Sequence, residues 1–182
     1  MTLDHTDRLI FDNFLSDAEF ELVSSYVLGP NFGWWIPEQE GRWNLEHVLY
    51  QQGGKSSPMD DVTFAKCLTA STRVKPFILI DFRTECFFKE DEPELVEFKS
   101  WYPLDREVQQ LYTGVFCLNE CNGYTQFAED NAPVKSRANR LILFPSHLEY
   151  RQINQSDTDR RYIQTFNIIS YDLPFNSGMK KF

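Results

Sequence analysis

Side chains that bind metals or act as nucleophiles are sparse in this chain. It contains three histidines, which are His5, His47 and His147. It contains four cysteines, which are Cys67, Cys86, Cys117 and Cys121. Cys117 and Cys121 lie close together, but no further His or Cys pair stands near them at the spacing of zinc ligands. A structural zinc site is therefore not expected, and the cysteines are expected to be reduced thiols of a cytosolic protein.

Two adjacent arginines, Arg160 and Arg161, precede the apolar stretch YIQTFNII. Successive side chains of a strand point to opposite faces, so only one of the two arginines faces the interior. Ile163 and Thr165 share a face with Arg161, and this pattern places Arg161 inward. A partly buried arginine requires a carboxylate partner. Asp105 or another inward-facing acid could supply that carboxylate.

Capping signals predict a helix near the start of the chain. Ser16 is typical of an N-cap, and Glu19 follows it at capping-box spacing. Gly29 and Pro30 predict the end of the helix. Apolar residues recur at helical spacing between these signals: Phe20, Leu22, Val23, Tyr26 and Val27. A flexible loop is expected over 51–58, and a second short helix over 61–71.

Short apolar runs separated by turn signals predict many strands after residue 73. The expected strands cover 77–82, 97–102, 112–118, 124–127, 140–144, 149–153 and 161–169, and an aromatic strand covers 32–36. Asn122-Gly123 is a hairpin signal. The acidic section 85–97 is expected to be a solvated loop, with a lid or partner-binding loop as the alternative. Helices followed by strands predict an α+β, mainly β fold: a jelly roll braced by N-terminal helices.

Composition narrows the class of protein. The 182 residues suit a single domain, with 1–72 as N-terminal support, 73–172 as the β core and 173–182 as a tail. The net charge of −9 argues against nucleic-acid binding, which depends on Lys and Arg that neutralise phosphates. No apolar stretch is long enough to cross a bilayer, and no signal peptide is recognised. A cytoplasmic location without membrane partners is expected.

Several motifs together resemble the 2-oxoglutarate/Fe(II)-dependent oxygenases, in particular small phage-encoded proteins of the prolyl-hydroxylase branch. They are DNFLSDAEFELVSSYVLGPNFGWWI, RVKPFILI, NECNGYTQF, SRANRLILFPSHLEYRQIN and DTDRRYIQTFNII. They cover most of the chain in the order expected for that family. The resemblance implies a double-stranded β-helix, which is the jelly roll of these enzymes.

The resemblance also implies where a metal site would lie. The family's His-x-Asp pair falls on Pro103-Leu104-Asp105, with Trp101 or Tyr102 as register alternatives, and only Asp105 matches the ligand type. The second histidine falls on Tyr150. His147 lies three residues earlier, which reverses its face on a strand. The family's arginine for 2-oxoglutarate falls on Arg161, with Arg160 as the register alternative. Cys117 stands where the family has a tyrosine.

Three functions follow from these departures. The first is a catalytically degenerate oxygenase-fold protein, without a cofactor, that acts as a binding or structural module in phage virions or assembly. A protein partner or self-assembly is then expected, and the candidate interface anchors are Trp34, Trp35, Trp43, Phe87, Phe88 and Phe182. The alternative is an active Fe(II)/2-oxoglutarate-dependent prolyl or peptidyl hydroxylase with non-standard ligands, namely Asp105 with Tyr150 or His147. The third is a metal-free pocket in which Arg161 binds a small carboxylate.

Overall fold

The computed structural model describes residues 2–3, 8–36, 44–51, 54–55, 77–91, 97–99 and 111–170. Several predictions concern residues outside these ranges: the helix over 61–71, the anchors Trp43 and Phe182, and the proposed ligand segment with Trp101, Tyr102, Pro103 and Asp105. Within the described residues, no helix is both long enough and apolar enough to span a bilayer.

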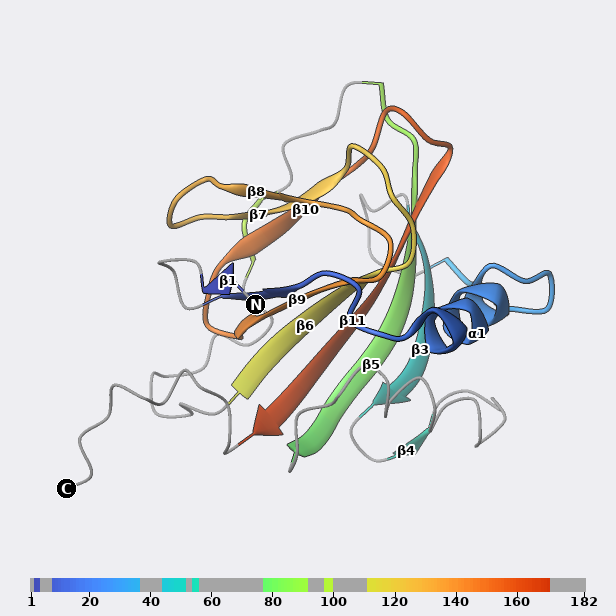
Figure 1. Ribbon diagram of the computed structural model, residues 1–182, viewed down its shortest axis with the longest axis horizontal. Helices are drawn as coiled ribbons and strands as arrows, with labels where there is room; N and C mark the ends of the chain where they lie inside the picture. Colours follow the sequence, from blue (N-terminus) through green and yellow to red (C-terminus); the bar gives the residue numbers. More distant parts are fainter. Residues whose placement is uncertain are drawn as a thin grey trace.

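Two antiparallel sheets form the body of the molecule (Figure 1). The larger sheet has the strand order β1-β2-β9-β6-β11-β5-β3-β4, and the smaller has the order β10-β7-β8. The bounds of the larger sheet's strands are β1 Thr2–Leu3, β2 Leu9–Phe11, β3 Asn44–Gln51, β4 Gly54–Lys55, β5 Phe77–Phe88, β6 Leu111–Cys117, β9 Arg140–Pro145 and β11 Arg160–Ser170. Those of the smaller sheet are β7 Tyr124–Phe127, β8 Pro133–Lys135 and β10 Tyr150–Ile153.

The larger sheet buries a different apolar cluster on each face because its strands alternate. On the outer face, Phe82, Phe116 and Phe166 pack in one cluster with Val23 and Val27 of the helix α1 (Asp17–Val27). The inner face packs against the smaller sheet, and its cluster includes Val115, Cys117, Phe127, Ile142, Phe144, Tyr150 and Ile163. Strand β11 lies between β5 and β6 and contributes to both clusters. The predicted fold class, an α+β and mainly β jelly roll, is confirmed. Of the predicted N-terminal helices, the described residues contain α1.

The helix α1 forms where its capping signals predict it. The backbone N–H of Ser16 donates to Glu19 at 2.9 Å, which is one arm of the capping box. Phe20 packs edge-on against Phe116 of the sheet, with ring centroids 6.1 Å apart. The segment before the helix is fixed by Asn139, whose amide bonds both the N–H and the carbonyl of Leu15 at 2.9 Å.

Several elements differ from the sequence prediction. The short strands β1, β2, β4 and β8 were not predicted, and β4 lies within the predicted loop over 51–58. The described part of the predicted strand over 97–102 is only an isolated bridge at Lys99. Strand β5 continues to Phe88, so the first part of the predicted acidic loop over 85–97 is strand. Strand β3 was not predicted, because its inward residues Asn44 and Glu46 are polar and hide the alternation. The predicted strand over 32–36 is only an isolated bridge between Trp35 and Glu46.

Candidate functional site

Arg161 lies at the start of β11 and points between the two sheets. Its side chain is fully buried. One terminal nitrogen donates to the carbonyl of Ile153 at 3.2 Å, and the other donates to Oε1 of Gln152 at 2.9 Å. Both partners lie on β10, so the guanidinium spans from the larger sheet to the smaller one. The ring of Phe87 lies beside it, with its centroid 5.7 Å from the guanidinium carbon.

These contacts leave the charge of Arg161 without a carboxylate among the described residues. Its hydrogen-bond partners there are carbonyl and amide oxygens. The internal ion pair expected from the sequence is therefore not formed with any described acid, and Asp105 lies outside the described residues. Nε of Arg161 and Nε2 of Gln152 are both buried and have no hydrogen-bond partner among the described residues. The site thus offers a positive charge and two donors to a ligand.

Arg160, the register alternative, lies on the opposite face. Its side chain is exposed, and it contacts the hydroxyl of Tyr162 at 3.4 Å and the ring of Phe88 at 5.9 Å. The structure therefore places Arg161 inward and Arg160 outward, because side chains alternate along β11.

Tyr150 begins β10, and its ring belongs to the inner apolar cluster. It packs edge-on against Phe144 at 5.0 Å and tilted against Phe127 at 6.4 Å. Its backbone pairs with Lys99. His147 is exposed in the turn between β9 and β10, with Ser146 buried beside it in sequence. At the position where the resemblance places the second iron-binding histidine, the structure therefore has the ring of Tyr150, which is part of the apolar core.

The cysteines near the site are buried thiols. Cys117 is fully buried on β6, opposite Ile163 of β11. Burial raises the pKa of the Cys121 thiol, while the nearby charge of Arg161 acts in the opposite direction. No group of three or more His, Cys, Asp or Glu side chains in the described ranges could hold a metal ion. The described residues therefore do not supply a two-histidine, one-carboxylate iron site.

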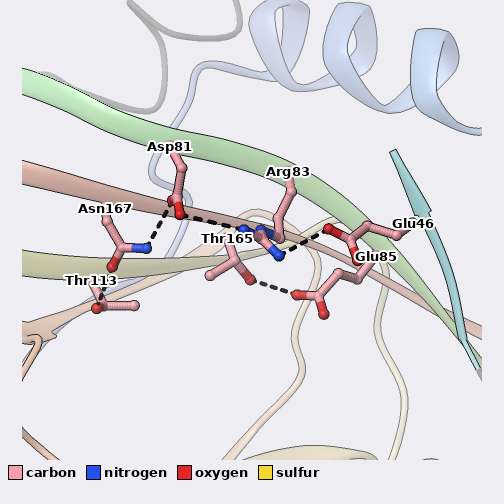
Figure 2. A network of polar contacts seen from close by, with 7 residues as sticks. All are labelled: Glu46, Asp81, Arg83, Glu85, Thr113, Thr165 and Asn167. Atoms are coloured by element: carbon pink, nitrogen blue, oxygen red, sulfur yellow. Dashed lines mark hydrogen bonds and ion pairs between the residues drawn. The ribbon is translucent and has the colours of Figure 1, made fainter. Parts of the chain in front are cut away.

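A network of polar side chains covers the inner face of the larger sheet away from Arg161 (Figure 2). We call it the polar floor, and its members are Glu46, Asp81, Arg83, Glu85, Thr113, Thr165 and Asn167. Arg83 donates to Glu46 at 2.9 Å and to Asp81 at 3.4 Å. Figure 2 shows these side chains on the side of the sheet away from α1.

Hydrogen bonds continue the polar floor across β11 to β6. Asn167 donates to Asp81 at 2.8 Å and accepts from Thr113 at 2.7 Å. Thr165 donates to Glu85 at 2.8 Å. Sequence reasoning missed this network, although the alternation of Asp81, Arg83 and Glu85 with buried residues was a signal for an inward polar row.

Comparison with known proteins shows the fold. No family model and no curated protein matches the chain. The structure of HygX from Streptomyces hygroscopicus, with nickel and 2-oxoglutarate bound, matches with TM-score 0.62 at 12% identity, over 94% of this chain and 89% of that one. A prolyl-4-hydroxylase from Pseudomonas putida matches with TM-score 0.60 at 11% identity, over 92% and 94%. The 2-oxoglutarate complex of a viral collagen prolyl hydroxylase from Paramecium bursaria Chlorella virus-1 matches with TM-score 0.54 at 14% identity, over 94% and 100%.

This chain therefore has the fold of the 2-oxoglutarate/Fe(II)-dependent oxygenases, as its motifs predict. The same comparison corrects the expectation of a protein without a cofactor. Solved structures of this fold hold nickel with 2-oxoglutarate, 2-oxoglutarate, or iron. They point to Fe(II) and 2-oxoglutarate as the cofactors to consider. The expectation that the protein uses no cofactor was therefore wrong.

Proposed function

We propose that this protein is a 2-oxoglutarate-dependent Fe(II) oxygenase in which Arg161 binds a carboxylate of 2-oxoglutarate. The observation that carries the proposal is the buried guanidinium of Arg161, which has no carboxylate partner among the described residues. A buried charge without a counter-ion is costly, and a bound carboxylate removes that cost. The fold supports the choice of ligand, since neighbours at TM-scores of 0.62 and 0.54 hold 2-oxoglutarate.

The residues around Arg161 fit a dicarboxylate. The planar guanidinium matches the two oxygens of a carboxylate. The amide N–H of Gln152 is buried and has no partner within the described ranges, and Oε1 of the same side chain lies 2.9 Å from Arg161. Phe87 supplies an apolar wall. Arg161 would therefore orient the co-substrate, and the packed sheets would exclude water from it.

The iron site departs from the family pattern. If bound, Fe(II) would supply O₂-dependent hydroxylation with 2-oxoglutarate as co-substrate, and the substrate proposed here is a prolyl or other peptidyl side chain. Asp105 is the carboxylate that the resemblance assigns, and Tyr150 or His147 would have to complete the set. The described residues do not fit the family's ligand set, because Tyr150 is packed among aromatic rings and His147 is exposed. A different ligand set is thus part of the proposal.

Thermal denaturation of metal-stripped protein tests the carboxylate site. At about 100 times its Kd, a ligand stabilises the folded state by about 2.7 kcal/mol, and each kcal/mol raises the Tm of a chain this long by about 2–4 °C. We expect 2-oxoglutarate, alone or with Mn(II), to raise the Tm of the wild type and of Arg160→Gln. We expect no rise for Arg161→Gln. No shift of the wild type, or an equal shift of Arg161→Gln, would overturn the assignment.

A partner-binding module on the same fold is the second candidate. The aromatic packing of Tyr150 favours it, since an apolar core at the second ligand position disfavours a metal there. A protein partner or self-assembly, including a role in a phage particle, belongs to this candidate. Release of succinate from 2-oxoglutarate in the presence of Fe(II) separates the two: turnover supports the oxygenase, and its absence together with no Mn(II) binding supports the module.

A further inference from the structure

The polar floor lies on the same face of the larger sheet as Arg161. Paired residues of neighbouring antiparallel strands point to the same side. Arg161 pairs with Phe87, Thr165 with Arg83, and Asn167 with Asp81. On the other side of β5, Glu46 pairs with Glu85. The floor therefore extends from the candidate 2-oxoglutarate site along the interior of the jelly roll, where a substrate would lie.

Among the described residues, the side chains that define the floor include three carboxylates and one guanidinium. Glu46 and Asp81 are both in contact with Arg83, so two carboxylates share one guanidinium. Burial raises the pKa of the Asp81 carboxyl, while its bonds to Asn167 and Arg83 act in the opposite direction. Arg83 and Glu46 retain 17% and 12% of their side-chain exposure, so this part of the floor is reachable from solvent.

A buried acceptor beside the acids points to a ligand that donates hydrogen bonds. Asn44 lies two residues before Glu46 on β3, so its side chain shares the face of the floor. It is 5% exposed, and its Oδ1 has no hydrogen-bond partner in the described part of the chain. A buried oxygen without a hydrogen bond lowers the stability of the fold, and a ligand that donates a hydrogen bond to it removes this penalty. An N–H group with a positive charge would satisfy both Asn44 and the neighbouring carboxylates.

Elsewhere on the inner face, apolar side chains fill the space between the sheets, so packing of the core does not by itself require the polar residues of the floor. On β6 and β9 the same face is filled by Val115, Ile142 and Phe144, which pack against the smaller sheet. Apolar residues at the positions of Glu46 and Asp81 would bury surface without any desolvation of charge, and buried ion pairs are weak stabilisers compared with such packing. The members of the polar floor lie on β3, β5 and β11, with Thr113 on β6.

We propose that the polar floor binds a cationic group of the substrate, a primary ammonium or a guanidinium, and so selects substrates that carry a positive charge. This inference rests on the proposed function, because it assigns the substrate class of the same interior. The net charge of −9 favours the approach of such a substrate to the protein.

Titrations of ¹⁵N-labelled protein by NMR test the selection in the absence of metal and 2-oxoglutarate. The probes are Nα-acetyl-lysine methylamide and its norleucine analogue, each also placed within a glycine- and alanine-flanked pentapeptide. We expect the lysine probes to bind at least about tenfold more tightly than the norleucine probes, the size expected for a hydrogen bond to a charged group. Tighter binding of the lysine pentapeptide would identify a peptide as the source of the cation, and equal binding would identify a small amine.

Matched variants locate the site. Glu46→Gln removes one charge from the floor at nearly constant shape, and Asn44→Leu removes the acceptor but keeps the charges. Both are expected to abolish the preference for lysine, whereas Glu21→Gln on the exposed face of α1 retains it. Equal affinities for lysine and norleucine probes, or no binding of either, would overturn the inference, as would an unchanged preference in both floor variants.

Thermal shifts with 2-oxoglutarate separate this inference from the proposed function. A 2-oxoglutarate shift without a lysine preference means that the polar floor inference fails alone. A lysine preference without a 2-oxoglutarate shift means that the proposed oxygenase fails, and the floor remains a cation site. Glu46→Gln is expected to keep the full 2-oxoglutarate shift, because Arg161 and Gln152 are unchanged.

Discussion

The phenol of Tyr150 stands where the family resemblance places a histidine, so this position can be tested by restoring the imidazole. Tyr150→His is expected to raise the affinity for Mn(II), measured by electron paramagnetic resonance with 2-oxoglutarate present, by at least about tenfold over wild type. Imidazole is a good ligand near neutral pH, whereas a phenol with a pKa of about 10 must lose a proton first.

Tyr150→Phe is the matched control for this position. It keeps the ring contacts with Phe144 and Phe127 and adds no ligand, so it should show no gain in affinity. Equal Mn(II) affinities of the histidine and phenylalanine variants would show that position 150 does not face a metal site.

Gly114 shows how closely the larger sheet packs at a single residue. A Cβ atom at this position would lie 2.1 Å from Cζ of Phe166 on the neighbouring strand. Gly114→Ala is therefore expected to destabilise the fold by about 1–3 kcal/mol, as overpacking of a core does. Urea denaturation measures the loss, and Gly114→Ala combined with Phe166→Leu should recover part of it. Gly33→Ala, whose new Cβ would meet its nearest atom at 3.9 Å, should be close to neutral.

At the scale of elements, Asn139 joins the N-terminal segment to β9. Its amide satisfies both backbone groups of Leu15, and its own backbone has a φ of 61°. Asn139→Gly keeps this backbone conformation but leaves two buried groups without partners, so a loss of about 1–3 kcal/mol is expected. Asn139→Ala should lose about 1 kcal/mol more, because a Cβ strains a positive φ. Chemical denaturation of the two variants measures both losses of stability. Equal stability of wild type and Asn139→Gly would contradict a stabilising role for the hydrogen bonds between Asn139 and Leu15.

The elements also show what the sequence could and could not predict. Local signals sufficed for α1, because the capping residues and the apolar spacing lie within one segment. They sufficed for the inward orientation of Arg161, because β11 alternates cleanly. They failed for β3 and for the end of β5, where polar residues point into the interior. Glu46 and Arg83 are 37 residues apart, and only strand pairing brings them together at 2.9 Å.

At the scale of the whole molecule, ion pairs at Asp12 and at Arg8 tie the N-terminal segment to the β core. Asp12 accepts two bonds from Arg140, at 2.6 and 2.9 Å, and Asp130 pairs with the buried Arg8. The hydrogen bond from Arg140 holds the pKa of the Asp12 carboxyl below its ordinary value. The hydrogen bond from Arg8 does the same for the pKa of Asp130. The free energy of unfolding therefore depends on pH through both acids.

The sign of this linkage follows from the lowered pKa values. The unfolded chain takes up protons at these acids near pH 3.8, while the folded chain does so only at lower pH. The stability that the pairs contribute is therefore present above about pH 4 and is lost as the pH falls through the folded pKa values. Burial acts oppositely on Asp81, because its pKa is raised and its contribution is lost as the pH rises.

Urea denaturation between pH 3 and pH 7 checks this prediction in the double variant Asp12→Asn with Asp130→Asn. At pH 7 the variant is expected to lose about 0.5–2 kcal/mol, a small value because both acids are partly exposed and such pairs are screened by solvent. Near pH 3 the gap between variant and wild type should narrow, since the wild-type carboxylates are then being protonated as well. Glu21→Gln should follow the wild type at every pH. A gap that stays constant down to pH 3 would mean that the two pairs do not carry the acid sensitivity of the fold.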